Sequence, residues 1–148
     1  MDLGRLRLNE WLAGLFGAGL LAVLFTDWYG PGGADAWESF AVTDVVLAIA
    51  GVLGVLALVL TASFETPAVS VAFETLAALV TTVASLFALV ALLNLPDGAG
   101  HRELGVALGL PLTLGVAVSL WTAIHQERPG RAVPGGTVEV ETLPAPDA

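Results

Sequence analysis

Long uncharged stretches alternate with short polar ones along this chain. Leu12 to Phe25 carries no charged residue, and neither does Val45 to Phe64. Extended to their flanking residues, the apolar stretches predict four helices, over residues 8–26, 41–63, 67–93 and 103–125. The shortest would rise about 28 Å, close to the roughly 30 Å hydrocarbon core of a bilayer. The pattern predicts an all-α membrane protein, an antiparallel four-helix transmembrane bundle built from residues 1–125.

The polar connections contain residues that favour helix ends. Asp35 followed by Glu38 fits a capping box ahead of the second helix, and Pro67 suits the first position of the third. Pro111 falls inside the fourth helix, where it should remove one hydrogen bond and kink the helix. Gly30-Pro31-Gly32-Gly33 predicts a turn. A phosphate-binding loop is the alternative, but the pattern offers neither the following Lys-Ser/Thr nor a preceding strand.

The end of the chain changes character. From Gln126 onward, Pro, Gly, Glu and Thr replace the apolar residues. This composition predicts a disordered cytoplasmic tail over residues 126–148. Thr137 to Thr142 alternates in polarity and could instead add a strand to a partner's sheet. We favour disorder, because one six-residue alternation is a weak signal.

Composition supports the membrane interpretation and excludes several functions. Of 148 residues, 56% are hydrophobic and 13% are charged, with a mean hydropathy of +0.84; a soluble domain is about a quarter charged. The net charge is −9 and Lys is absent, which argues against nucleic acid as a partner. Without Cys there is no disulfide, thiolate metal site or cysteine nucleophile. The expected partners are the lipid bilayer and a second copy or another membrane protein.

The arginines indicate an orientation in the membrane. Four of the five lie near the two chain ends: Arg5, Arg7, Arg128 and Arg131. Positive charge stays on the cytoplasmic side, and four spans put both termini on one side. We therefore expect a multi-pass membrane protein with both termini in the cytoplasm. Arg102 would lie on the outer side, within reach of Asp44 or Asp97.

The longest polar interruption, residues 26–44, carries three aromatic rings. Trp28, Tyr29 and Trp37 suit the aromatic belt at the outer membrane interface, an interpretation that we favour over ligand stacking. A second hypothesis is an ordered outer-loop aromatic cap, in which Trp37 packs on Trp28 or Tyr29.

Glu74 is the most informative polar residue, because a carboxyl group inside a bilayer costs several kcal/mol unless it is paired, protonated or hydrated. At 100° per residue it shares a helix face with small and polar residues: Ser70, Ala77, Ala78, Thr81, Ser85 and Ala88. That face should contact other helices, while Leu76, Leu79, Val83, Phe87 and Val90 meet lipid. The candidate partners of Glu74 are Asn9, Arg7, Trp121, Thr122 and His125. We favour interhelical hydrogen bonding over a proton or cation site.

The remaining titratable residues carry weaker signals. Asp44 is a second candidate intramembrane polar site, near a helix N-terminus that favours negative charge. Glu10 is expected to be a surface acid beside Arg7. His101 and His125 fall on opposite membrane sides and cannot form one metal site. We therefore predict no metal, no cofactor and no catalytic residues.

Small residues at four-residue spacing indicate close helix contacts. Three pairs fit this pattern: Ala13 and Gly17, Ala50 and Gly54, and Gly105 and Gly109. They are compatible with a compact bundle or with a dimer.

The outer loop also carries a resemblance. Asp27-Trp28-Tyr29-Gly30, then Ala36-Trp37-Glu38-Ser39-Phe40, then Asp44 resembles a family of small four-span integral membrane proteins from high-GC bacteria. This chain departs from that family at Thr26-Asp27, where the family tends to have an apolar residue and Pro. The resemblance implies the four-span topology and a bacterial plasma membrane as the location, and it supplies no mechanism because the family has no assigned activity. The sequence thus favours a non-enzymatic structural or accessory membrane protein, with a small proton- or cation-linked transporter or channel component using Glu74 as the alternative.

Overall fold

The computed structural model describes residues 6–30, 34–39, 41–63, 67–95 and 100–126. Its long helices are α1 (Leu8–Val23), α3 (Ala41–Ser63), α4 (Pro67–Leu93) and α5 (Leu104–Gln126). A four-residue helix, α2 (Ala36–Ser39), precedes α3. α5 continues through Pro111. Apart from Gln126, the predicted tail lies outside the described residues.

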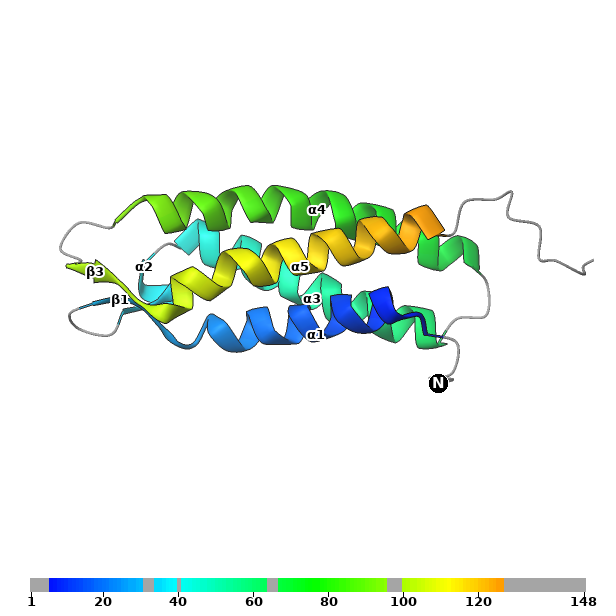
Figure 1. The fold of residues 1–148 in the computed structure, drawn as a ribbon, viewed down its shortest axis with the longest axis horizontal. Coiled ribbons are helices and arrows are strands. Elements are labelled where there is room, and N and C mark those ends of the chain that lie inside the picture. The colour runs from blue at the N-terminus through cyan, green and yellow to red at the C-terminus, as the bar shows by residue number, and fades with distance from the viewer. Residues whose placement is uncertain (1–5, 31–33, 40, 64–66, 96–99, 127–148) are drawn as a thin grey trace, which may run out of the picture.

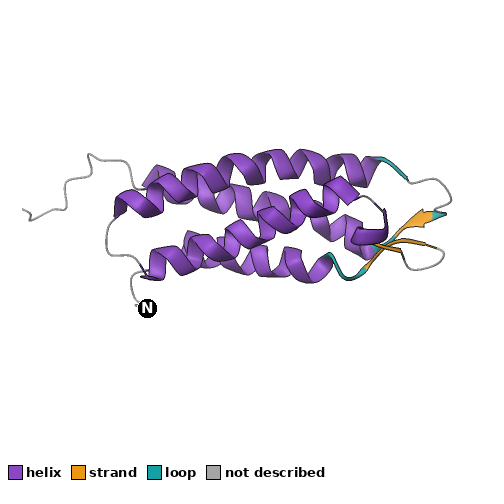
Figure 2. Ribbon diagram, turned by 180° about the vertical axis from the view of Figure 1, so that it is seen from behind, coloured by secondary structure: helices purple, strands orange, loops and turns teal. Residues whose placement is uncertain are grey.

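The long helices lie side by side, and three short strands gather at one end of them (Figure 1). We call this the cap end, and we call the opposite end, where α1 begins and α5 ends, the far end. α1 and α4 each pack against both α3 and α5. The two views agree on this arrangement, with all strands at the same end (Figure 2).

The strands form a small antiparallel sheet that the sequence pattern did not predict. Its order is β2 (Ala34–Asp35), β1 (Asp27–Gly30), β3 (His101–Arg102). Tyr29 pairs with Arg102 and Gly30 with His101 across β1 and β3. The sheet therefore ties the first loop of the chain to the segment just before α5. Two of the strands have only two residues, too few to produce a visible alternation of polarity.

Helix α4 has one face of small, buried side chains and an opposite face of large, exposed ones. The face predicted around Glu74 is buried, with Ala77, Ala78 and Thr81 fully inaccessible. The opposite face exposes Leu76, Leu79, Leu86 and other large hydrocarbon side chains. Small side chains let neighbouring helices approach closely, while the bulky ones face outward. This distribution is the reverse of the one that water favours.

Three of the helices are long and apolar enough to cross a membrane. They are Val42–Ser63, Val71–Leu93 and Leu104–Gln126 within α3, α4 and α5. α1 is a shorter apolar helix of 16 residues. The chain thus has the predominantly helical, membrane-type character that its hydrophobic pattern predicts, and the small sheet is the departure from that pattern.

The buried core has two apolar parts. Trp28, Leu20 and Leu47 belong to a cluster at the cap end, and Ala13, Ala57, Ala77, Val116 and Leu120 belong to one at the far end. Thr81 and Thr113 come between the two clusters along α4 and α5, and both are fully buried. Their hydroxyl groups donate to carbonyl oxygens of their own helices, those of Ala77 at 2.8 Å and Gly109 at 2.6 Å. The polar groups in the middle of the core are therefore satisfied locally.

Candidate functional site

The cap end is organised around the C-terminus of α4. The Tyr29 hydroxyl donates to the carbonyl oxygen of Ala91 at 2.5 Å. The Arg102 guanidinium donates from Nε to Leu92 O at 2.6 Å and from Nη2 to Leu93 O at 2.8 Å. The last carbonyls of a helix have no partner within the helix, and positive charge is favourable there. Arg102 was expected to reach Asp44 or Asp97. Its hydrogen bonds to described residues go to backbone carbonyls and not to Asp44, and Asp97 lies outside the described residues.

Trp28 fills the cap end of the core. Its side chain is fully buried, and its indole N–H donates to Val23 O at 2.9 Å, at the C-terminus of α1. A Cβ atom at Gly109 would lie 2.9 Å from the indole ring, and one at Gly105 would collide with it. The two glycines of α5 thus form the seat of the indole. The prediction that Trp28 and Tyr29 sit in an interfacial belt is wrong in this respect, because both are buried inside the protein.

Trp37 is placed differently from the other two aromatic residues. It is 41% exposed, and its ring lies 6.1 Å from that of Phe25, centroid to centroid. The ring contact shown for Trp37 is therefore with Phe25, not with Trp28 or Tyr29 as the cap hypothesis supposed. Its exposure leaves Trp37 free to lie at an interface between apolar and aqueous surroundings.

Asp35 accepts a hydrogen bond from the Glu38 backbone N–H at 3.0 Å, which confirms its predicted capping role.

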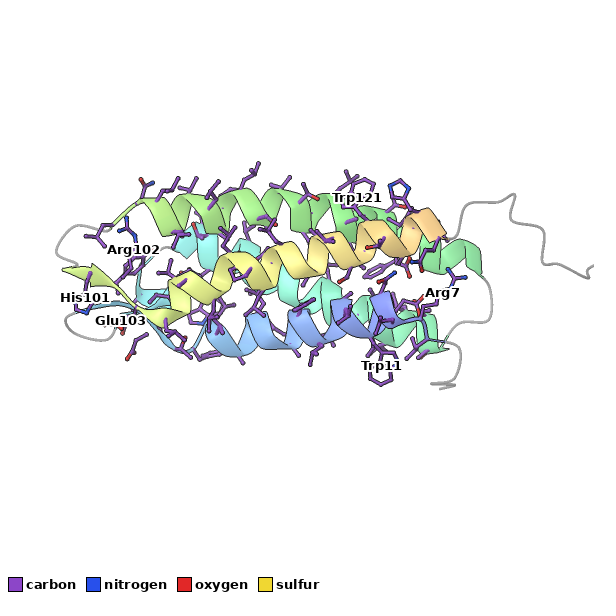
Figure 3. All side chains as sticks on the ribbon, viewed as in Figure 1. Arg7, Trp11, His101, Arg102, Glu103 and Trp121 are labelled. Atoms are coloured by element: carbon purple, nitrogen blue, oxygen red, sulfur yellow. The ribbon has the colours of Figure 1, made fainter. Side chains whose placement is uncertain are left out.

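Strand β3 and the residue after it form a polar tip at the cap end. His101 Nε2 lies 2.6 Å from Glu103 Oε1, and both side chains are exposed. Figure 3 shows His101, Arg102 and Glu103 together at the cap end. Exposed ion pairs of this kind contribute little to stability. We therefore assign the cap's stability to Tyr29, Arg102 and Trp28, and not to this pair.

Asp44 lies in the first turn of α3 and is fully buried. It is close enough to Tyr29 to oppose ionisation of the phenol. Burial, and to a smaller extent the charge of Asp44, raise the pKa of Tyr29 to about 12, whereas Arg102 lowers it. Asp44 and Tyr29 thus belong to one electrostatic environment beneath the cap.

Glu74 lies inside the far end, 1% exposed. The Thr61 hydroxyl of α3 donates to its Oε1 at 3.1 Å. The hydrogen bond joins two helices, as the structural interpretation of Glu74 requires. Thr61 was not among the partners expected for Glu74, which lie in or just before the first predicted helix and in the fourth.

The burial of Glu10 differs from what the sequence predicted. It was expected on the surface, but only 3% of its side chain is exposed. Its Oε2 accepts a hydrogen bond from the Arg7 backbone N–H at 2.7 Å, so it caps the start of α1. Sequence reasoning missed this because Arg7 stands where a capping box usually has Ser or Thr.

Glu10 and Glu74 lie at a similar level of the bundle. A Cβ atom at Gly14 would meet Leu58, and one at Gly54 would meet the Ala13 carbonyl. Residue numbers on α3 therefore fall as those on α1 rise, which brings Glu10 level with the turn that contains Thr61. Since Thr61 binds Glu74, two buried carboxyl groups enter the same far end, from α1 and from α4.

Two tryptophan residues at the far end are exposed. Trp11 and Trp121 are partly exposed and appear on different helices in Figure 3. Trp121 Nε1 donates to Thr82 Oγ1 at 3.1 Å, and its ring lies 6.4 Å from that of His125. The Thr122 hydroxyl donates to Val118 O of its own helix. Trp121 and Thr122 thus have partners other than Glu74.

The predicted small-residue pairs all mark close contacts within the chain. A Cβ atom at Gly17 would lie 2.6 Å from Gly51 O, and one at Gly54 would lie 2.8 Å from Ala13 O. α1 and α3 therefore meet backbone to backbone. The third pair, Gly105 and Gly109, contacts the Trp28 side chain instead of another helix. These glycines are thus used inside one chain and are not left available for a dimer contact.

Metal binding finds no support in the ranges that the structure describes, where no cluster of three or more His, Asp or Glu side chains could hold an ion. Comparisons of the chain with family models, curated proteins and solved structures found no match. The class of the protein therefore rests on its own architecture, which is predominantly helical with three helices of membrane-spanning length.

Proposed function

We propose that this chain is a multi-pass integral membrane protein of structural or accessory type, without enzymatic activity. The observation that carries the proposal is the distribution of side chains on α3 and α4. Val45, Ile49 and Val52 face outward on α3, as Leu79, Val83 and Val90 do on α4, while Ala, Gly, Thr and Ser lie inside. Such a surface is costly in water and favourable in lipid.

We further propose four spans, with α1 as the first. α1 rises only about 24 Å at 1.5 Å per residue, but its packing on Gly51, Gly54 and Leu58 runs along much of α3. Trp28 and Tyr29 then continue the buried column beyond the last turn of α1. The positive-inside rule supports cytoplasmic termini in a bacterial plasma membrane, with the cap on the outer side.

The accessory role is supported by how the polar side chains are used. Tyr29, Arg102, Asp35 and Glu10 each bind backbone groups at helix ends. Thr61 and Glu74 join two helices. These interactions stabilise a rigid body whose outer cap and helix faces are available to other membrane components.

Cysteine labelling tests the membrane topology on a clean background, because the chain has no Cys. His101→Cys and Glu38→Cys place thiols on exposed cap positions, and Gln126→Cys places one at the far end. A membrane-impermeant maleimide should label the cap variants in intact cells and Gln126→Cys only after permeabilisation. A chain found in the soluble fraction, or one labelled equally at both ends in intact cells, contradicts the proposal.

A second candidate function is a proton- or cation-linked transporter or channel component using Glu74. The observation that favours it is Glu10, a second buried carboxyl group at the same far end. Transport pathways are commonly built from several such groups. Vesicles loaded with a pH-sensitive dye distinguish the two functions: Glu74→Gln and Glu10→Gln should abolish flux if the chain transports. If it is accessory, they should change stability alone, and Glu38→Gln on the exposed cap is the matched control.

A further inference from the structure

α3 and α4 leave an open groove between them. Six side chains line it: Val46, Ile49, Leu79, Val80, Val83 and Phe87. Three of these side chains are about half exposed, so the groove opens on the outward face of the two helices. All six are hydrocarbon, so a ligand there gains no hydrogen bond and must itself be apolar.

The size of the groove suits a flexible chain. Its volume is about 320 Å³, which at roughly 30 Å³ for a group the size of water corresponds to about ten methylene groups. A transmembrane helix of a partner is the rival occupant. Helices in membranes associate through Gly, Ala, Ser and Thr, and none of these residues lines the groove. Bulky branched side chains keep a second backbone away but leave space for a thin acyl chain.

The position of the groove adds a second, independent observation. Phe87 lies six residues before the end of α4, so the cap-side limit of the groove is about 9 Å below the last turn, at 1.5 Å per residue. At that last turn lies the exposed guanidinium of Arg102, bound to Leu92 and Leu93 through Nε and Nη2. Its Nη1 makes no hydrogen bond within the part of the chain that the structure describes. A cation thus lies at the end of α4, beyond the cap-side limit of the groove.

We propose that a phospholipid binds this chain, with one acyl chain in the α3–α4 groove and its phosphate at Arg102. A guanidinium binds phosphate oxygens through charge-assisted hydrogen bonds. Groove and cation are linked by the end of α4, which Arg102 itself caps. This inference rests on the proposed membrane location, which supplies both the hydrocarbon surroundings and the ligand.

The acyl part is tested by filling the groove. The full chain is purified in detergent and incubated with phosphatidylglycerol, and bound lipid is counted by native mass spectrometry. Val83→Trp should weaken retention at least tenfold. Leu86→Trp, on the same helix but outside the groove and 60% exposed, should retain lipid as the wild type does. Equal retention by Val83→Trp overturns the groove assignment, and so does a change in oligomeric state without a change in lipid.

The phosphate part is tested by comparing phosphatidylglycerol with a diacylglycerol that has the same acyl chains. The wild type should prefer the phospholipid about tenfold, and Arg102→Gln should lose that preference. Tyr29→Phe is the matched control, because it removes another hydrogen bond at the same helix end without removing the charge. An unchanged preference in Arg102→Gln overturns the headgroup assignment. A membrane-inserted chain that retains no lipid refutes this inference alone, whereas a soluble chain refutes the proposed function.

Discussion

Tyr29 and Arg102 are partners across β1 and β3, and together they bind three consecutive carbonyl groups at the end of α4. The pairing fixes the spacing of a phenol and a guanidinium on neighbouring strands of the sheet. The sheet thus caps a helix that lies between two of its strands in the sequence, because β1 comes well before α4 and β3 comes directly after it.

Removing either partner should destabilise the protein. Tyr29→Phe should cost about 1 kcal/mol and Arg102→Gln about 1.5–3 kcal/mol, since the second loses bonds from a charged donor. Unfolding in mixed micelles measures both, with His101→Gln as a control expected to stay within about 0.5 kcal/mol. Because the two residues share one helix end, the double variant should be non-additive. Additive losses would mean that the two residues act separately.

Of the substitutions that add one methyl group at the cap end, Gly105→Ala should lower the stability of the fold most. Its Cβ would collide with the Trp28 indole and approach Asp27 O at 2.6 Å. Overpacking against a backbone atom costs about 1–3 kcal/mol. Gly19→Ala is the matched control, because its new Cβ meets only the end of the Leu112 side chain at 3.2 Å. Trp fluorescence and thermal unfolding report both variants, and equal behaviour would refute the tight indole seat.

Tyr29 is the only tyrosine in the sequence, so its ionisation can be followed by phenolate absorbance. We expect a midpoint near pH 12 in the folded protein, in line with the pKa raised by burial, against about 10 when unfolded. The folded state holds the proton more tightly, so this contribution to stability is complete below pH 10. It is lost as the pH rises from 10 to 12. A midpoint near 10 in folded protein would show that the phenol is not buried.

The hydrogen bond between Thr61 and Glu74 predicts a stability effect at the far end. Thr61→Val keeps the shape but removes the donor to a buried carboxyl group, at a cost of about 1–3 kcal/mol. Thr75→Val is the matched control, because the Thr75 hydroxyl binds Val71 O of its own helix. Its loss should change the stability by less than about 0.5 kcal/mol. If both variants unfold alike in micelles, the bond between α3 and α4 contributes nothing.

The long helices could be predicted from the sequence, because the length of each hydrophobic run indicates a span and the spacing of small residues indicates a helix face. The buried face around Glu74 followed from 100° geometry alone. The contacts of Tyr29 and Arg102 could not be predicted, since they depend on a sheet whose outer strands have two residues each and lie far apart in sequence. Trp28 was misplaced for a related reason. Any Trp in a polar loop beside an apolar stretch suggests a position at the membrane interface. Only the packed structure shows that the Trp28 side chain packs against Gly105 and Gly109.

The seat of Trp28 has a consequence for the order of assembly. During synthesis the N-terminal part of a chain emerges first, so α1 and α3 can meet while α5 is still inside the ribosome. Until Gly105 and Gly109 appear, the indole lacks the part of its contact surface that α5 provides, and β1 lacks β3. α5 therefore completes the packing of the first loop. A chain stopped after α4 should therefore leave the indole more accessible to quenchers than the full chain does.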